Sequence, residues 1–342
     1  MQNPIPHPPH SVIDLHCDSV FLLMEGKDLR RPVPSAHVDL PRLREGRVAL
    51  QVFAVYVPPE TESTKAFEYT AARLDVIEDF ARSDDLLAPV ETAKELRVCM
   101  AAGKTGIMCA VENGLAIEES LEKLELLRRR KVRIVTLVHS QDMSWIFSCT
   151  GTGQFNPDSG QGRGLSRFGE KVIDAMNELG IIPDVSHSSE SAFWDVIKRS
   201  KKPVIASHSC AYAICAAARN LKDDQLKALG DSGGLVGINF FSGFLSEQAR
   251  AEGSPPQNRQ QPYVKVPMSV IADHIDYIIN LAGEDCVALG SDFDGIPASP
   301  EGVTGSDFYP VLENELRSRG YSENRIEKIF SANFLRVLEN WD

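Results

Sequence analysis

The feature of this sequence that most constrains its fold is an alternation of eight short apolar runs with amphipathic stretches. Each run is rich in β-branched residues and has the length of a parallel strand that is buried on both faces. The runs are VIDLHCD (12–18), VALQVFAVYV (48–57), GIMCAVENG (106–114), VRIVTLVHS (132–140), GIIPDVSHS (180–188), PVIASHS (203–209), LVGINFF (235–241) and VALGSDFDG (287–295). The clearest helical stretches between them are 63–82, 120–130, 167–180, 191–200 and 269–283. Eight strand and helix units predict an α/β fold, a (β/α)8 TIM barrel.

The chain is expected to form a single domain over residues 1–342, with residues 1–10 as a flexible tail. No change in composition and no long Pro/Gly/Ser linker divides it. An open doubly wound sheet is the alternative arrangement of the same elements, and it would carry a GxGxxG turn after the first strand. The first predicted strand continues as VIDLHCDSV, which lacks that turn. The barrel is therefore favoured.

Two predicted connections, 141–166 and 242–266, are too long to be simple turns. They follow the fourth and seventh predicted strands and so leave the carboxyl ends of strands, where barrel enzymes keep their active sites. We interpret both as long active-site loops that act as lids. Insertions without a role are the alternative.

Composition excludes several classes of partner and location. The formal net charge of -12 leaves no Lys/Arg excess for a polyanion, so no nucleic-acid partner is expected. The seven cysteines are scattered without a CxxC pair, which is typical of reduced thiols in the cytosol. The segment MQNPIPHPPHSV is not a secretory signal, and no apolar run reaches the roughly 18 to 20 residues that span a bilayer. We expect a cytoplasmic protein without a membrane anchor.

Ionisable residues gather at the carboxyl ends of the predicted strands, and in a closed barrel these ends converge on one basin. The residues are His16 and Asp18 on the first strand, Glu112 on the third, His139 on the fourth, His187 on the fifth, His208 on the sixth, and Asp292 and Asp294 on the eighth. Half of the chain's eight histidines thus lie at strand ends. This convergence predicts a site for cations.

His16 and Asp18 lie two residues apart, so on an extended strand both side chains face the same way and can reach one metal ion. A core histidine bonded to a neighbouring acid is the alternative for such a pair. Glu112 interrupts an apolar strand, where a carboxylate without a partner is costly to bury. Its two oxygens could bridge two metal ions, or it could pair with a buried arginine.

His187 and His208 occur in parallel contexts, PDVSHSS and VIASHSC. Neutral imidazoles suit zinc and similar metals, so these two histidines and one oxygen of Glu112 would bind the second ion. The first ion would take His16, Asp18 and the other oxygen of Glu112. Mixed nitrogen and oxygen ligand sets with open positions are typical of catalytic sites. A thiolate-rich structural metal site and a non-catalytic barrel are the alternatives to a catalytic site. On the last predicted strand, spacing alone does not decide whether Asp292 or Asp294 faces the metal ions.

The site residues named above, in their order along the chain, resemble those of the membrane dipeptidase family. Its members are also called renal dipeptidases, and some of them are bacterial cytosolic proteins. The matching segments are DLHCD (14–18), AVENG (110–114), TLVHS (136–140), LSRFGEKVIDAMNELGIIPDVSHSS (165–189), IASHSCAYAICAAARNL (205–221) and GSDFDG (290–295). They extend over nearly the whole chain. The mammalian members are secreted and lipid-anchored, and the segments after Glu112 and His139 are particular to this chain, so neither an anchor nor a side-chain preference is carried over.

The resemblance implies a metal-dependent barrel hydrolase, a metallo-dipeptidase with two Zn²⁺ per chain and a small dipeptide as substrate. It implies the zinc ligands His16, Asp18, Glu112, His187 and His208, in the two sets given above. It further suggests His139 as a substrate-contacting and catalytic histidine, Arg219 as a substrate-binding residue, and Asp292, rather than Asp294, as the catalytic aspartate. A homodimer is suggested only by the resemblance.

We hypothesise that a water or hydroxide between the two ions, held in part by Glu112, attacks the amide carbon while Asp292 moves a proton to the departing amine. His139 would stabilise the developing oxyanion, and Arg219 would pair with the free carboxylate of the dipeptide. Without the resemblance, Arg219 would be interpreted as a helix-surface arginine. The alternative function is another binuclear amidohydrolase acting on a cyclic amide, lactone or phosphotriester. Such enzymes often begin with HxH and bridge their metals with a lysine on the fourth strand, and VRIVTLVHS has no lysine after Arg133.

Overall fold

The computed structural model of the chain describes residues 10–151, 164–253, 264 and 266–342, and its centre is a closed barrel of eight parallel strands. The barrel strands are β1 (Val12–Cys17), β2 (Val48–Tyr56), β4 (Thr105–Glu112), β5 (Ile134–Thr136), β6 (Ile182–Asp184), β7 (Ile205–Ser209), β8 (Leu235–Ile238) and β9 (Val287–Leu289). Each lies within one of the eight predicted runs or overlaps it. Pairing between β2 and β4, from Leu50 opposite Gly106 to Tyr56 opposite Glu112, closes the barrel. The predicted TIM barrel is confirmed.

A short ninth strand, β3 (Leu87–Pro89), was not predicted. It pairs in parallel with the first residues of β4, from Leu87 opposite Thr105 to Pro89 opposite Ile107. Three residues that include a proline carry no alternation that a sequence pattern could detect. The strand lies at the edge of the sheet and takes no part in closing the barrel.

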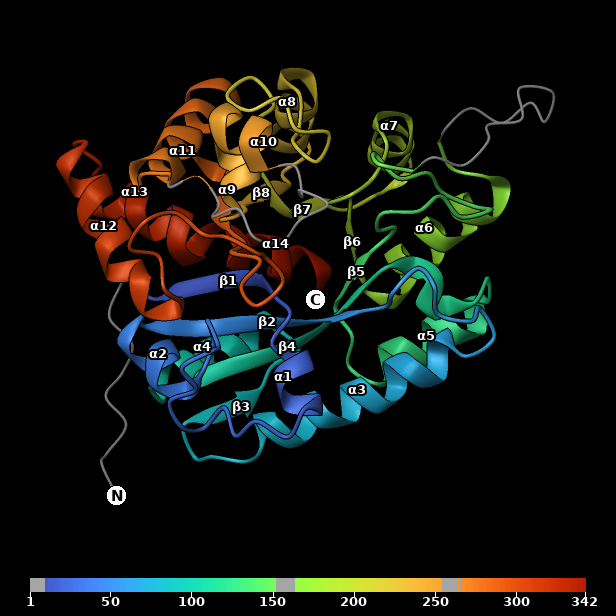
Figure 1. Ribbon diagram of the computed structural model, residues 1–342. Helices are drawn as coiled ribbons and strands as arrows, with labels where there is room; N and C mark the ends of the chain where they lie inside the picture. Colours follow the sequence, from blue (N-terminus) through green and yellow to red (C-terminus); the bar gives the residue numbers. More distant parts are fainter. Residues whose placement is uncertain (1–9, 152–163, 254–263, 265) are drawn as a thin grey trace.

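Helices surround the strands, as Figure 1 shows with α3 and α5 on one side and α8 and α11 on the other. The outer helices are α3 (Ala66–Ala81), α5 (Leu121–Arg129), α6 (Arg167–Leu179), α7 (Glu190–Arg199), α8 (Asp223–Asp231) and α11 (Ser269–Ala282). Several begin at a serine whose hydroxyl accepts a hydrogen bond from the third helical residue, including Ser120, Ser166 and Ser189. Each such cap contributes about 1 kcal/mol to the helix.

Apolar side chains fill the barrel and its amino-terminal end. Leu15, Met108 and Ile205 belong to this inner core and are fully buried. Two helices, α4 (Ala93–Ala101) and α14 (Asn333–Trp341), cover the end, and Trp341 Nε1 donates a hydrogen bond of 2.8 Å to the carbonyl of Pro203. Leucine, methionine and isoleucine side chains each contribute about 1.5–3 kcal/mol to folding stability when they are fully buried. This end is packed, so a site must lie at the opposite, carboxyl end of the strands.

The remaining α-helices of the described chain are α1 (Val20–Met24), α2 (Leu40–Glu45), α9 (Ser242–Leu245), α10 (Glu247–Gly253), α12 (Tyr309–Ser318) and α13 (Glu323–Glu327). The first part of the predicted loop 242–266 is therefore helical, in α9 and α10. Residues 152–163 of the other predicted loop, 254–263 and 265 of this one, and 1–9 of the predicted tail lie outside the described residues. His10 is described, and its Nε2 lies 2.6 Å from Glu323 Oε2.

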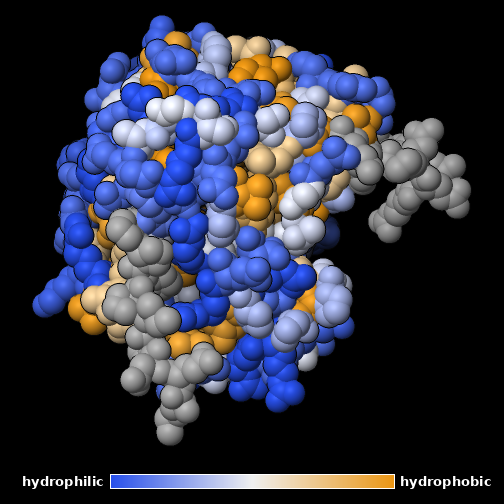
Figure 2. Space-filling model, turned by 90° about the vertical axis from the view of Figure 1, so that its left-hand side faces the viewer, coloured by the Kyte–Doolittle hydropathy of each residue, from blue (hydrophilic) through white to orange (hydrophobic). Residues whose placement is uncertain are grey.

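The surface, the helices and the cysteines give three further results. In Figure 2 polar side chains cover most of the face shown, and apolar ones appear in separate patches. Among the described residues, no helix is long and apolar enough to cross a bilayer. All seven cysteines fall in the described part of the chain, and each is a free thiol there.

Candidate metal and active site

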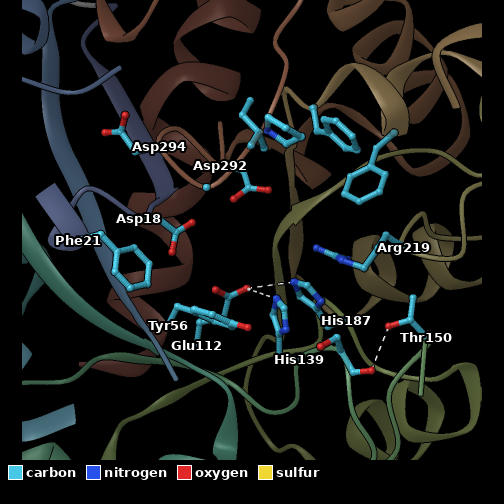
Figure 3. Close-up of a pocket in the computed structure, with 16 residues that line it drawn as sticks. Asp18, Phe21, Tyr56, Glu112, His139, Thr150, His187, Arg219, Asp292 and Asp294 are labelled. Atoms are coloured by element: carbon cyan, nitrogen blue, oxygen red, sulfur yellow. Dashed lines mark hydrogen bonds and ion pairs between the residues drawn. The ribbon is translucent and has the colours of Figure 1, made fainter. Parts of the chain in front are cut away.

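A cavity of about 600 Å³ opens at the carboxyl end of the barrel. This volume is in the range that holds a small-molecule ligand. Figure 3 shows the carboxylates of Asp18 and Asp292 on one side of the cavity and Arg219 on the other. Glu112 lies below Asp18 in this view, at the end of β4, with His139 and His187 beside it. The structure thus brings residues from separate strands into one basin, as the barrel predicts.

Glu112 lies at the centre of the cluster, and its two oxygens face different imidazoles. Oε1 lies 3.0 Å from Nε2 of His187, 3.4 Å from Nε2 of His208 and 3.8 Å from Nε2 of His139. Oε2 lies 3.7 Å from Nε2 of His16. The Glu112 residue is only 4% exposed, so its charge must be balanced inside the protein.

His16 occupies the other half of the cluster. Its Nε2 lies 3.6 Å from Asp18 Oδ2 and 3.8 Å from Asp292 Oδ1. In the described structure this nitrogen and Asp18 Oδ1 are buried polar atoms without a hydrogen-bond partner. Buried polar atoms are nearly always satisfied, so their lack of partners suits a ligand that they would share.

The distances in this cluster are those expected of ligand atoms that share a metal ion. Two ligand atoms at about 2.1 Å from one tetrahedral ion lie roughly 3.4 Å apart. The separations around Glu112 and His16 range from 3.0 to 3.8 Å. Three overlapping groups here have ligand atoms within 4.8 Å of one another: His16, Glu112 and His208; Glu112, His139 and His187; and His16, Asp18 and Asp292. The donor set of imidazoles and carboxylates therefore fits the binding of metal ions.

Burial is the largest single influence on the pKa values of Glu112, Asp292 and His16. It raises the pKa of Glu112 to about 8 and that of Asp292 to about 7, although His16 opposes both shifts. Burial by itself would lower the pKa of His16, but the carboxylates of Glu112, Asp18 and Asp292 outweigh it and raise the value to about 10. These raised pKa values mean that the metal-free site binds protons near neutral pH, because it contains too many carboxylates to keep all of them ionised.

The three remaining imidazoles shift in the opposite direction. Burial holds the pKa values of His187 and His208 well below the ordinary value and lowers that of His139 to about 4. The nearby guanidinium of Arg219 adds to each of these shifts. At neutral pH these imidazoles carry no charge, which is the form that binds a metal ion.

The protein stripped of metal should become less stable as pH rises from 6.5 to 8. Glu112 binds a proton in the folded state that the unfolded state has lost between pH 4.5 and about 8, and Asp292 does so between 3.8 and about 7. His16 does the same between 6.5 and about 10, so each group's contribution to folding stability falls as pH rises. Bound cations replace these protons and bind only the folded state.

Thermal unfolding with stoichiometric zinc and with a chelator, at pH 6.5 and at pH 8, checks this expectation. These are the ordinary pKa of His16 and the raised value of Glu112. The difference in Tm between the two forms should be wider by a few degrees at the higher pH. A difference that stays constant or narrows would contradict the proposed charge balance.

The structure separates the two aspartates that spacing could not. Asp292 Oδ2 accepts a 2.8 Å hydrogen bond from Asn239 Nδ2, which leaves Oδ1 toward His16. Asp294 instead accepts hydrogen bonds from the backbone N–H of His37 (2.7 Å) and from the hydroxyl of Ser19 (2.5 Å). Asp294 also lines the cavity, but both of its oxygens bind segments next to the site, and Figure 3 shows it apart from the cluster.

Arg219 lies between β7 and α8 and is only 6% exposed, so it is not a helix-surface arginine. Its Nη2 donates to the carbonyl of His208 at 2.9 Å, and its Nη1 donates to the hydroxyl of Ser209 at 3.3 Å. The guanidinium carbon lies 5.5 Å from the ring centroid of Phe244. Nε is buried without a hydrogen-bond partner in the described structure. This planar cation lines the cavity and suits a carboxylate ligand.

Sequence reasoning missed two residues at strand ends. Tyr56 is the last residue of β2 and lines the cavity, and Asn239 follows β8 and holds Asp292. Both stand at the position that marked the other site residues, so a search for any polar group there would have found them. Phe21, Phe241 and Phe244 add apolar walls that sequence spacing does not indicate.

The chain matches the family model described as membrane dipeptidase (peptidase family M19) over residues 7–342. Among curated proteins it is 42% identical over 188 residues to an uncharacterized protein in the pqqA 5′ region of Klebsiella pneumoniae, covering 55% of this chain and 65% of that one. It is 30% identical over 333 residues to dipeptidase 3 of Mus musculus, covering 95% of this chain and 63% of that one. The chain thus spans a little under two thirds of the length of these relatives.

Two similar solved structures cover the whole barrel. A metallopeptidase named dipeptidase AC superposes with a TM-score of 0.85 at 29% identity, covering 96% of this chain and 98% of that one. A metallopeptidase from Rhodobacter sphaeroides, bound to a phosphinate mimic of the dipeptide L-Ala-D-Ala, superposes with a TM-score of 0.82 at 28% identity, covering 96% and 99%.

Proposed function

Because the chain belongs to the membrane dipeptidase family, we propose that it is a binuclear zinc dipeptidase that hydrolyses the peptide bond of dipeptides. The observation that carries this proposal is the position of Glu112, whose two oxygens face His187 and His16 at 3.0 and 3.7 Å. A related metallopeptidase binds a mimic of a dipeptide, which supports the same substrate class for this chain.

The proposed ligands form two sets that share Glu112. His16 and Asp18 would complete one set, and His187 and His208 would complete the other. When bound, the two ions would supply a water or hydroxide of lowered pKa as the nucleophile and a Lewis acid for the carbonyl oxygen. The unpartnered Nε2 of His16 and the neutral state of His187 and His208 support these assignments.

Asp292 is the proposed proton carrier. It would accept a proton from the attacking water at Oδ1 and deliver it to the departing amine, which must be protonated to leave. Its position supports this role, because Asp292 lines the cavity and Asn239 holds Oδ2, which leaves Oδ1 toward His16.

Arg219 and His139 are the proposed substrate contacts. Arg219 would bind the free carboxylate of the dipeptide with two parallel hydrogen bonds, which selects substrates that end one residue after the scissile bond. His139 would donate a hydrogen bond to the carbonyl oxygen as negative charge develops there. His139 Nδ1 is buried without a hydrogen-bond partner, and Nε2 lies toward Glu112.

Titration of the metal-free protein with zinc tests the proposal. Hydrolysis of a dipeptide should return as zinc is added and should reach its plateau at two ions per chain. A panel of dipeptides, lactones, cyclic amides and phosphotriesters, measured on the zinc-loaded protein, should show turnover of the dipeptides. Turnover of another substrate class alone, or full activity at one ion per chain, would contradict it.

A further inference from the structure

A buried aspartate, Asp184, lies behind the metal cluster and joins three neighbouring strands. It is the last residue of β6 and is fully buried. Its Oδ1 accepts hydrogen bonds from the backbone N–H groups of Ser186 and Ser207, at 2.9 and 2.8 Å. Its Oδ2 accepts hydrogen bonds from the hydroxyls of Thr136 on β5 and Ser207 on β7, each at 2.5 Å. A carboxylate only accepts hydrogen bonds, so all four protons point toward Asp184.

The direction of these hydrogen bonds continues to His208. The hydroxyl proton of Ser207 is directed to Asp184, so Ser207 Oγ can only accept from Nδ1 of His208, which lies 2.7 Å away. Nδ1 therefore carries the ring proton, and Nε2 carries the lone pair, which can accept a hydrogen bond from His187 Nε2 in the metal-free protein. That Nε2 lies 3.4 Å from Glu112 Oε1 and 3.0 Å from His187 Nε2.

We propose that Asp184 and Ser207 are positioning residues that fix the tautomer of His208, so that its Nε2 is always ready to bind the second metal ion. This inference rests on the proposed function, because it assumes that His208 is a metal ligand. The ring nitrogen that does not bind the metal usually donates to such a partner, and loss of that partner weakens metal binding by about 10- to 100-fold. The backbone of His208 is held as well, because its N–H donates to Ser186 Oγ at 3.1 Å.

The barrel contains a second buried aspartate that provides a control. Asp14 on β1 is also fully buried and accepts hydrogen bonds from the hydroxyls of Ser291 (2.6 Å) and Tyr309 (2.7 Å). It also accepts from the backbone N–H groups of Ser291, at 2.8 Å, and of His16, at 3.4 Å. In the described part of the chain, no imidazole nitrogen hydrogen-bonds to Asp14, Ser291 or Tyr309. Asp14→Asn should therefore carry a similar structural cost without changing a histidine tautomer.

Asp184→Asn should invert the hydrogen-bond direction. The amide oxygen must face the two backbone N–H groups, so the amide NH₂ replaces Oδ2 and donates to Ser207. Ser207 then donates its own proton to His208 Nδ1, and the ring proton moves to Nε2. The variant keeps the shape of the side chain but places a proton on the nitrogen that the metal requires.

Ser207→Ala and Thr136→Val form a matched pair, because each removes one of the two hydroxyls on Asp184 Oδ2. Zinc affinity is measured by competition with a chelator. Ser207→Ala should lower the affinity for one of the two zinc ions by at least about tenfold. Ser207→Thr keeps the hydroxyl and should have the wild-type affinity. Thr136→Val should change the affinity by less than about threefold. Equal losses in Ser207→Ala and Thr136→Val would overturn the proposal, because a general packing defect would then explain both.

The nitrogen-15 shifts of the histidine rings in the metal-free protein give a readout independent of metal and activity. Wild-type His208 should carry its proton on Nδ1, and Asp184→Asn should carry it on Nε2, whereas Asp14→Asn should resemble wild type. An Nε2-protonated His208 in the wild type would overturn the proposal. If the wild type bound one zinc ion only, the binuclear function would fail, and these spectra would still decide the tautomer. Ser207→Ala and Ser207→Thr keep the test complete if Asp184→Asn does not fold.

Discussion

Asp292→Asn should lower kcat for dipeptides by about 10³-fold or more while both zinc ions stay bound. The substitution keeps the shape of the side chain but removes the basic oxygen that would take a proton from the attacking water. A positioned general acid or base contributes about 10²- to 10⁴-fold, and this residue would serve both the attack and the departure of the amine. The measurement is steady-state hydrolysis together with metal content for the same preparation.

Asp294→Asn is the matched control for this prediction. The two aspartates lie two residues apart and both have positive φ, 63° at Asp292 and 65° at Asp294. Asp294, however, hydrogen-bonds to Ser19 and His37 and not to the cluster. Its variant should lower Tm and keep kcat within about tenfold of wild type. Loss of zinc from Asp292→Asn would instead make Asp292 a metal ligand, and equal kcat losses in both variants would remove its special role.

The barrel was predictable because parallel strands that are buried on both faces leave a strong apolar signal. All eight barrel strands lie within or overlap the predicted runs, and five predicted helices correspond to α3, α5, α6, α7 and α11. The closing of the amino-terminal end by α4 and α14 was not predicted. That packing joins residues such as Ala93 and Trp341, which are far apart in the sequence and carry no local pattern.

The choice between Asp292 and Asp294 shows where sequence periodicity ends. Alternation by two assumes an extended strand, but β9 ends at Leu289 and both aspartates have left-handed backbone conformations. His187 has a φ of 69° and follows β6, which ends at Asp184. The polar residues after short strands thus mark the correct end of the barrel, while their directions depend on turns that sequence spacing does not specify.

The hydrogen bonds that join His208, Ser207 and Asp184 were not predicted, for a different reason. Ser207 and Asp184 were read as parts of apolar strand runs, because a buried hydroxyl or carboxylate in a strand resembles an ordinary interruption of the pattern. Only the structure shows that Ser207 Oγ lies 2.5 Å from Asp184 Oδ2 and 2.7 Å from His208 Nδ1. The direction of a hydrogen bond depends on the three-dimensional arrangement of the atoms. The sequence therefore contains these residues but does not indicate which of them donates to which.

Arg219→Ala should lower kcat/KM for dipeptides by about 10²- to 10³-fold, mainly through KM. Loss of one partner from a buried, hydrogen-bonded charge pair costs about 2–5 kcal/mol, and here the carboxylate of the substrate would be left without its cation. Arg219→Lys keeps the charge but not the planar fork, so it should recover only part of the loss. The variants are compared on a dipeptide and on the same dipeptide with an amidated carboxyl group.

The amide is the decisive substrate, because Arg219 also donates to the carbonyl of His208 and its loss could disturb that ligand. If Arg219 binds the substrate carboxylate, the amide is a poor substrate of the wild type and suffers little further loss in Arg219→Ala. If Arg219 only supports His208, both substrates lose activity by the same factor and zinc content falls with them. A loss confined to the free dipeptide, at unchanged zinc content, therefore assigns Arg219 to substrate binding and links the length of the substrate to one guanidinium in the cavity wall.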